Sequence, residues 1–495
     1  MENAATPLRM ARWPIFLLIA LAGLGLRLPQ LGVRPMHTDE AVNAYIVGQI
    51  LSGEPFNYDP QDRHGPALAV FAVPLARLQG ARTFSDLTEV ELRLTAALAG
   101  TVTILLLGAA VEVFSMVPCL IAALLCAAGP LTVYYDRFFI HESLFCTATL
   151  GLIVSAWRAW QRNSVSYAAL TGACAALMLA CKETAAIHFF ALFVALFVYW
   201  RWDQQGKGVL ELIRPRAMLA ALVTFLLLTV TLFTWFGRNW GALPALLRAV
   251  PDVLARAGGQ GHQKPFWYYG WLLSTGRSGW VLVALAGIGL FVTFAKRDHC
   301  RFRLLAYYAI LLVLTYSLIP YKTPWLALNL WVPLALLAGR AIEWSWRVAA
   351  TRLELRTAIP AFAILGASAA ALIAHDTRQR VFVHPADEAN PYAYAHTSDD
   401  LLGLAPEIEQ LARRNPIAEP RIAVIAHDAW PLPWYLRHFS HVGFWQPGQP
   451  VGEADFYVTS TEAAEQYEEQ LRNFRPEFFG VRPGVLLLLW SPAPK

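Results

Sequence analysis

The stretch Met36-His37-Thr38-Asp39-Glu40-Ala41-Val42-Asn43-Ala44 directly follows the first long apolar segment of the chain. Two adjacent carboxylates at the mouth of a membrane span are costly, and such charges commonly mark functional sites. In the simplest alternative, Thr38 or Asp39 only caps the helix that follows. If this acidic pair belongs to a site, other polar motifs should lie on the same side of the membrane.

The composition indicates a polytopic membrane protein. Of 495 residues, 56% are hydrophobic, 13% are aromatic and only 15% are charged, whereas a typical soluble domain has about 25% charged residues. The net charge of +5 comes from arginines in separate loops, which excludes a nucleic-acid-binding patch.

The apolar runs predict about eleven transmembrane helices, since about 20 apolar residues cross the hydrocarbon core. The expected spans are 13–32, 90–112, 115–134, 138–160, 165–182, 184–201, 217–237, 278–295, 303–320, 324–342 and 357–375.

Basic residues cluster on alternate loops, which places the N-terminus in the cytoplasm and the C-terminus outside a cytoplasmic (inner) membrane. Only the turn at residues 111–115 carries no positive charge. The clusters are Arg9/Arg12, Arg158/Arg162, Arg201/Lys207/Arg214/Arg216, Lys296/Arg297/Arg301/Arg303 and Arg347/Arg352/Arg356.

Two long loops lie outside in this topology. The first contains amphipathic stretches at 40–52 and 66–80, which we expect to be interfacial helices. The second holds the amphipathic segment 243–257, and an aromatic run at 267–271 that is also typical of an interfacial belt.

The chain becomes polar and proline-rich near residue 375, which predicts a transmembrane domain at 1–375 and a small extracytoplasmic α/β domain at 376–495. Expected strands are 422–426, 456–458 and 485–489. A helix is expected from Glu462 to Phe474, with an N-cap from Thr459-Ser460-Thr461.

Several further polar motifs fall on the same outer side as Asp39-Glu40, and we expect them to converge on one face. Taken singly, each has a local alternative: a turn, a structural histidine, or an arginine or lysine that reaches lipid headgroups. No spacing resembles a zinc site. The motifs are Asp62-Arg63-His64-Gly65-Pro66, Tyr134-Tyr135-Asp136-Arg137 with His141-Glu142, Lys182-Glu183, Gly261-His262-Gln263-Lys264-Pro265 and Tyr321-Lys322-Thr323-Pro324-Trp325.

Carboxylates that face several cations beside apolar spans suit chemistry on a lipid phosphate. One carboxylate would deprotonate a hydroxyl acceptor while the cations stabilise the departing phosphate. No glycine-rich phosphate loop occurs in the chain, and an outer-face reaction needs no nucleotide. No metal site is predicted, although a carboxylate pair also suits a divalent cation.

At these residues the chain resembles membrane glycosyltransferases of the GT-C fold, the superfamily of protein O-mannosyltransferases and aminoarabinose transferases. More closely, it resembles the prokaryotic flippase activity-associated branch. The resemblance covers nearly the whole chain. It is carried by His37-Thr38-Asp39-Glu40-Ala41, His64-Gly65-Pro66, the stretches 261–269 and 319–325, Tyr394-Ala395-His396-Thr397-Ser398 and Pro431-Leu432-Pro433-Trp434-Tyr435.

The resemblance implies an inverting transfer of a sugar from a polyprenyl-phosphate donor, with Asp39 as the base and Glu40 orienting it or the acceptor. Aminoarabinose transferases have an acidic-lysine-proline sequence where this chain has Arg63-His64-Gly65-Pro66, so the phosphate-binding cation stays open. Its candidates are Arg63, His64, Arg137, Lys182 and Lys322. Candidates for binding sugar or acceptor are Asp62, His141, Glu142, Glu183, His262, Lys264, Trp267, Tyr268 and Tyr321.

Two rival functions belong to other classes: a flippase or transporter of the same lipid-linked sugar, and a non-catalytic, flippase-associated scaffold. A transporter typically carries charges in mid-span and inverted repeats, and the sequence has neither. The donor sugar is not readable from the residues, nor is the acceptor, whether glycan, lipid or protein.

Overall fold

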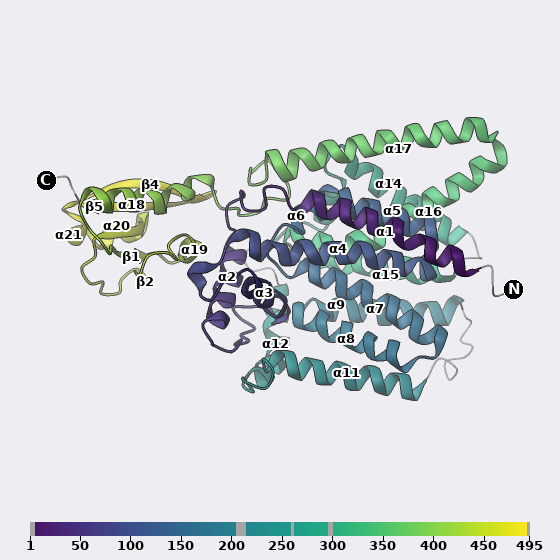
Figure 1. Cartoon of the computed structure of the whole chain (residues 1–495), viewed down its shortest axis with the longest axis horizontal. Helices are drawn as coiled ribbons and strands as arrows, with labels where there is room; N and C mark the ends of the chain where they lie inside the picture. Colours follow the sequence, from purple (N-terminus) through teal and green to yellow (C-terminus); the bar gives the residue numbers. More distant parts are fainter. Residues whose placement is uncertain (1–4, 204–213, 259–261, 296–299, 493–495) are drawn as a thin grey trace. The chain divides into compact units, whose positions relative to one another are not determined.

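The computed structural model describes residues 5–203, 214–258, 262–295 and 300–492. Lys207, Gly261, Lys296 and Arg297 lie outside the described residues, and the side chain of Arg9 is also not described. The fold is mostly helical with one small sheet, as expected (Figure 1). The predicted fold class is therefore confirmed.

The chain divides into two compact units. The helical unit comprises Met1–Pro29, Pro55–Phe71 and Arg93–Val383, and the sheet unit comprises Gln30–Glu54, Ala72–Leu92 and His384–Lys495. The sequence had predicted a single boundary near residue 375. Two segments of the first loop group with the C-terminal residues instead, because that loop packs on them.

Long helices that lie side by side make up the helical unit (Figure 1). Helix α8 packs on α7 and α11, and α16 packs on α5 and α14. The helices are α1 (Ala5–Arg27), α4 (Glu89–Phe114, helical unit from Arg93), α5 (Met116–Ala128), α6 (Pro130–Tyr135), α7 (Glu142–Arg162), α8 (Val165–Cys181), α9 (Ala185–Val198), α11 (Pro215–Phe233), α12 (Ala242–Ala257), α13 (Tyr268–Ser274), α14 (Gly276–Ala295), α15 (Cys300–Leu318), α16 (Leu328–Arg352) and α17 (Leu355–Thr377), with short turns η2 (Tyr199–Asp203), η3 (Pro324–Ala327) and η4 (Arg378–Val383).

Seven helices in the described residues are long and apolar enough to cross a membrane, fewer than the eleven spans predicted. The other four predicted spans lie on α1, α5, α7 and α8. The predicted span 115–134 is broken because α5 ends before Gly129 and Pro130 starts α6. Proline lacks the N–H that a continuous helix needs. The described helices establish a multi-pass membrane protein.

Four of the arginines predicted to face the cytoplasm meet at one end of this unit. Arg12, Arg158 and Arg162 all donate to the Glu112 carboxylate, and Arg301 donates to the Glu112 carbonyl. The turn at 111–115, which had no positive label, therefore lies among four arginines. Their common position supports the alternation of basic loops, and the sidedness itself stays a prediction.

A five-stranded sheet in the order β2-β1-β3-β5-β4 forms the core of the sheet unit. β1 pairs in parallel with β2 and β3, and β5 pairs antiparallel with β3 and β4. The strands are β1 (Arg421–Ile425), β2 (His441–Trp445), β3 (Phe456–Ser460), β4 (Phe474–Arg482) and β5 (Val485–Pro492). β1, β3 and β5 match the predicted strands.

The predicted helix from Glu462 to Phe474 is shorter in the structure. It becomes α20 (Thr461–Gln466) and α21 (Glu468–Leu471), and β4 starts at Phe474. Ser460, within the predicted capping cluster, does cap α20 by accepting from the Ala463 N–H at 3.2 Å. One face of the sheet packs on these helices around Ile425, Tyr457 and Tyr467.

The first loop contributes α2 (Thr38–Leu51) and η1 (Phe84–Asp86) to the sheet unit, beside α19 (Leu432–Tyr435). Edge-to-face aromatic pairs join them, with Phe84 against both Tyr45 and Trp434. α3 (Ala67–Leu78), like α2, matches a predicted amphipathic helix. The other helices of this unit are η5 (Asp399–Gly403) and α18 (Leu404–Arg414).

Candidate active site

The acidic pair lies in the first turn of α2, and the cap of this helix is His37. His37 Nδ1 accepts the Asp39 backbone N–H at 3.0 Å, and the Glu40 carboxylate accepts the His37 backbone N–H at 3.2 Å. This reciprocal capping box pairs two N–H groups that a helix start leaves unsatisfied. The expected cap at Thr38 or Asp39 is thus wrong, because the carboxylate at the third helical position selects His37.

The two carboxylates have different environments. Glu40 is fully buried, and Arg34 lies 3.7 Å from it as an ion-pair partner. Asp39 is half-buried, and among the described residues its carboxylate has no hydrogen bond or ion pair. The positive end of the α2 dipole favours a negative charge there. Asp39 is therefore the carboxylate of the pair that is available to another molecule.

Residues far along the chain hold the stretch before α2 in place. The Tyr435 hydroxyl accepts the Met36 N–H at 2.8 Å, and the Thr397 hydroxyl donates to the Met36 carbonyl at 2.7 Å. His37 Nε2 lies 3.1 Å from the Tyr394 carbonyl. Because Nδ1 is an acceptor, Nε2 carries the proton and donates to this carbonyl. Two C-terminal motifs, at 394–398 and 431–435, thus fix the backbone that presents Asp39.

In the helical unit, His64 and Glu183 form the centre of a polar cluster that also contains Tyr58, His141, Glu142 and Lys182. We refer to it as the His64–Glu183 cluster. His64 Nδ1 lies 2.9 Å from the Glu183 carboxylate, which also accepts from the Tyr58 hydroxyl at 3.1 Å. The His64 and His141 rings meet edge to face at 5.4 Å. The structure therefore joins two predicted motifs, 62–66 and 182–183.

Charge within this cluster is balanced in pairs. Lys182 Nζ donates to Glu142 at 2.5 Å. Burial raises the pKa of Glu183, but the His64 charge, the His64 hydrogen bond and Lys182 outweigh it and hold the pKa below its ordinary 4.5. Burial lowers the pKa of His141 well below 6.5, and the charges of His64 and Lys182 lower it further. His141 is thus neutral and donates from Nε2 to the Gly65 carbonyl at 3.2 Å.

Gly65 allows the loop at 62–66 to approach the end of α8. A Cβ at this position would lie 2.2 Å from the Ala180 carbonyl oxygen. No side chain tolerates that contact, so only glycine brings His64 to Glu183 in this way. Just before it, Arg63 is ion-paired to its neighbour Asp62 at 2.9 Å, and the Asp62 side chain is mostly exposed.

Arg137 binds the end of α1. Its Nη1 donates to the carbonyl of Arg27 at 2.8 Å, a group that a helix end leaves unsatisfied, and to the carbonyl of Pro29, two residues further on, at 2.5 Å. Its guanidinium also stacks on Phe382, 4.8 Å from the ring centre. Arg137 therefore has a structural role in addition to the predicted phosphate contact.

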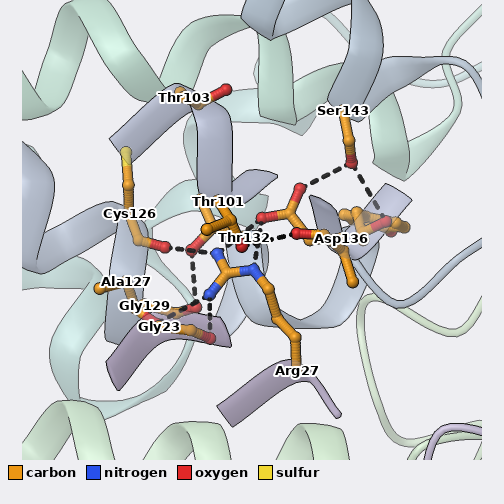
Figure 2. Close-up of polar contacts among 12 residues, drawn as sticks. Gly23, Arg27, Thr101, Thr103, Cys126, Ala127, Gly129, Thr132, Asp136 and Ser143 are labelled. Carbon is orange, nitrogen blue, oxygen red and sulfur yellow. Dashed lines mark hydrogen bonds and ion pairs between the residues drawn. The ribbon is translucent and has the colours of Figure 1, made fainter. Parts of the chain in front are cut away.

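The preceding residue, Asp136, forms a fully buried ion pair with Arg27 (Figure 2). Arg27 Nε and Nη2 donate to one Asp136 oxygen at 3.0 and 2.6 Å, and Ser143 donates to the other at 2.6 Å. The remaining Arg27 donors reach the carbonyls of Gly23, Cys126 and Ala127. Charge and hydrogen bonds are both satisfied, as a buried pair requires.

Lys322 lies in a third group. It is buried, and its Nζ donates to the carbonyls of Ile319 and Lys264. Burial lowers its pKa. The motif containing His262 pairs with this loop through a backbone bridge between Gln263 and Tyr321, and the His262 and Tyr321 rings lie 4.9 Å apart. The structure thus brings together His262, Lys264, Tyr321 and Lys322.

The two aromatic candidates of this region differ in exposure. Trp267 is 63% exposed, whereas Tyr268 is only 8% exposed. Trp267 is thus the one whose ring is open to stacking on another molecule. The sixteen predicted site residues are therefore arranged as Asp39 and Glu40 in the sheet unit and three groups in the helical unit, and their convergence on one face stays a prediction.

Sequence reasoning missed the residues that hold the candidates in place. Arg34, Tyr58, Thr397 and Tyr435 were not proposed as members of the site. A glutamate three residues after His37 was the available signal for the cap. Tyr435 and Thr397 lie in motifs that indicated only the resemblance to the glycosyltransferase family. No feature of the neighbouring sequence indicates that these two residues bind residues 36–37.

The comparisons with known proteins agree with this architecture. Residues 78–235 match the family model described as dolichyl-phosphate-mannose-protein mannosyltransferase. A comparison with curated proteins finds no match. Among solved structures, the chain is similar to ArnT from Cupriavidus metallidurans bound to undecaprenyl phosphate, with a TM-score of 0.67, 16% identity, and coverage of 95% of this chain and 97% of that one.

It is also similar to the archaeal oligosaccharyltransferase AglB from Archaeoglobus fulgidus in complex with an inhibitory peptide and a dolichol-phosphate. Here the TM-score is 0.55 at 14% identity, with coverage of 97% of this chain and 76% of that one. The arabinofuranosyltransferase AftD from Mycobacteria matches with a TM-score of 0.50 at 15% identity, over 97% of this chain and 41% of that one.

The protein thus has the GT-C fold of membrane glycosyltransferases. Within this class, the predicted resemblance to the superfamily of protein O-mannosyltransferases and ArnT is confirmed by the family match and the fold. The match also supports a transferase as the class of enzyme. The flippase activity-associated branch stays a prediction.

Proposed function

We propose that the protein is an inverting glycosyltransferase that moves a sugar from a polyprenyl-phosphate donor to an acceptor on the outer face of the cytoplasmic membrane. The observation that carries this proposal is the half-buried Asp39 carboxylate, held by a capped helix start and without a partner among the described residues. ArnT with undecaprenyl phosphate and AglB with a dolichol-phosphate support a lipid phosphate as part of the substrate.

In the proposed reaction, Asp39 accepts the proton of an acceptor hydroxyl. The acceptor oxygen attacks the anomeric carbon while the bond from that carbon to the phosphate oxygen breaks. The electron pair leaves with the polyprenyl phosphate, and the single displacement inverts the anomeric configuration. Glu40 does not exchange protons in this scheme, because His37 and Arg34 already engage it. Its role is to position the turn that carries Asp39.

The departing phosphate needs positive charge. Of the five predicted cations, Lys182 is neutralised by Glu142 and Arg63 by Asp62. Among the described residues, Lys322 donates only to the backbone carbonyls of Ile319 and Lys264, so its charge is not neutralised. We therefore rank Lys322 first among the phosphate-binding candidates, and Arg137, which donates to the carbonyls of Arg27 and Pro29, stays a candidate.

The test uses the purified full chain in lipid nanodiscs with undecaprenyl-phosphate mannose, and a crude membrane extract as the source of acceptors. The readout is release of undecaprenyl phosphate. Asp39→Asn is expected to lower the release at least a hundredfold, a typical loss for a general base, without changing the melting temperature. Glu54→Gln is the matched control, since it removes an exposed carboxylate from the same loop that is not a site candidate. Equal activity of Asp39→Asn and wild type would remove Asp39 from the mechanism.

The same protein, reconstituted in sealed liposomes, separates a transferase from a flippase. A flippase moves a fluorescent donor between leaflets and leaves it intact, whereas a transferase consumes it. Donor movement without any release of undecaprenyl phosphate, across a panel of donor sugars, would favour the transporter.

A further inference from the structure

The opposite end of the helical unit carries charges that the proposed transfer does not use. Glu142 starts α7 and Arg162 ends it, so the two ends of this helix lie about 30 Å apart at 1.5 Å per residue. At the Arg162 end, Glu112 accepts from Arg12 at 2.9 Å, from Arg158 at 3.1 Å and from Arg162 at 3.2 Å. We call these residues, together with Arg301, the Glu112 cluster.

Positive charge is in excess in the Glu112 cluster. Arg301 contributes a fourth guanidinium, which donates to the Glu112 carbonyl at 3.0 Å rather than to a carboxylate. Four cations therefore surround one carboxylate among the described residues. Next to it, Glu343 accepts from Ser115 and is shared by Arg340 and Arg347, so that carboxylate leaves positive charge as well. A network of ion pairs that only stabilises the fold does not need more arginines than carboxylates.

The cluster also has donors to spare. Arg12 is 93% buried, yet its Nε has no hydrogen-bond partner among the described residues. Arg162 and Arg301 are exposed; Arg162 also donates to the Tyr167 hydroxyl and Arg301 to the Val113 carbonyl, and the other N–H groups of both have no acceptor among the described residues. Guanidinium groups in such forks match the oxygens of a phosphate in pairs. The unmet donors and the unmet charge both call for an anion.

Aromatic rings surround these arginines. Arg158 and Arg162 stack on Tyr167, and Arg301 stacks on Trp157 at 4.7 Å. Trp160, one helical turn from Trp157, is 44% exposed. Tryptophan and tyrosine are enriched at the level of lipid headgroups, and basic pockets between membrane helices bind anionic headgroups. This combination distinguishes a lipid phosphate from a soluble phosphorylated partner.

We infer that the Glu112 cluster is a binding site for the phosphodiester headgroup of an anionic phospholipid, at the end of the bundle predicted to face the cytoplasm. The outward donors of Arg162 and Arg301 bind the phosphate oxygens, and Glu112 keeps the guanidinium groups together in the empty site. The lipid then ties the first part of α1, the end of α4, the end of α7 and the start of α15 to one leaflet.

The test measures binding of phosphatidylglycerol to the full chain in phosphatidylcholine nanodiscs by native mass spectrometry. Arg162→Gln and Arg301→Gln are each expected to weaken binding about fivefold, the effect of about 1 kcal/mol per basic residue. Arg356→Gln is the matched control, because Arg356 is an arginine that is also exposed but lies outside the cluster. It is expected to bind like wild type.

Each outcome decides for or against the site. Selective loss in the two cluster variants, with unchanged melting temperatures without lipid, supports it. Equal weakening in all three variants would mean a diffuse surface charge and would overturn it. Inorganic phosphate is the second probe: displacement of phosphatidylglycerol at millimolar concentration supports recognition of the phosphate group, whereas phosphate binding without any preference for phosphatidylglycerol over phosphatidylcholine would overturn the lipid assignment.

Discussion

The buried carboxylates of the helical unit contrast with Asp39 of the sheet unit. In the helical unit, Glu112, Asp136 and Glu142 each lie within 2.9 Å of an arginine or lysine nitrogen, and Glu183 lies 2.9 Å from His64. In the sheet unit, Asp39 meets none among the described residues, although its neighbour Glu40 has Arg34. An ionised carboxylate inside a bundle of apolar helices costs several kcal/mol unless it is paired. The ion pairs of the helical unit are therefore explained by burial alone. Burial does not explain why the Asp39 carboxylate is left unpaired at a helix start, and this difference indicates a function for Asp39.

The largest expected effect comes from breaking the most buried pair. Asp136→Ala leaves the Arg27 guanidinium, which has no exposed surface, without its anion, and should lower the free energy of unfolding by about 3–5 kcal/mol. Chemical unfolding in detergent measures it. The double variant Arg27→Met with Asp136→Leu should regain most of this loss, and failure to regain it would mean that the pair does more than neutralise itself.

A smaller loss is expected for Glu112→Gln. The change removes the charge shared by three arginines, one of them largely exposed, but glutamine keeps an acceptor oxygen, so we expect a loss of about 2 kcal/mol in total. Thermal unfolding at low and high salt is the measurement, since added anions should restore part of the stability. Glu354→Gln is the control: its ion pair with Arg356 is exposed, so its effect should be close to zero.

The His64–Glu183 cluster predicts a dependence of stability on pH. Both His141 and Glu183 have lowered pKa values in the folded protein. The unfolded chain therefore takes up protons first, and the free energy of unfolding falls as pH drops below 6.5 and again below 4.5. The slope for one group is at most about 1.4 kcal/mol per pH unit. His141→Gln should flatten the first part of the curve, and an unchanged curve would contradict the assignment.

In the sheet unit, Glu40→Ala should cost about 1 kcal/mol, because it removes half of the capping box. Melting of the full chain checks this value. Because Glu40 only positions the turn, we expect the activity of Glu40→Ala to fall in proportion to the fraction of protein that is unfolded. A larger fall in activity would contradict this role.

The smallest effect on stability is expected for Asp39→Asn, within about 0.5 kcal/mol, since no contact among the described residues is lost. The same melting experiment as for Glu40→Ala provides the comparison. A marked destabilisation by Asp39→Asn would show that the carboxylate is structural, and the contrast between the two units would disappear.

Much of the fold could be predicted, because apolar runs and turn residues are local signals. The helices around residues 40–52 and 66–80 and the strands at 422–426, 456–458 and 485–489 were found in this way. The break between α5 and α6 was missed although Gly129 and Pro130 signal it, since mean hydropathy stays high across them. β2 and β4 were missed because their faces are largely exposed and carry no clear alternation.

The candidate site was predictable as a set of residue types and not as a set of partners. Lys182 and His64 were predicted as site residues, but their pairing with Glu142 and Glu183 depends on segments that meet only in three dimensions. The close approach allowed by Gly65 is of the same kind. Hydrogen bonds from residues 394–435 to Met36 and His37 span most of the chain and leave no local signal.

The arginine that ends α1 has a consequence for how the protein is made. Arg27 lies within the first predicted span, and its partner Asp136 lies 109 residues further along the chain. When the ribosome delivers the first helix to the membrane, Asp136 has not yet been synthesised. An unpaired arginine within a span costs up to about 2.5–3.5 kcal/mol on insertion. We therefore expect the first helix to reach its final position only after the segment that carries Asp136 has emerged.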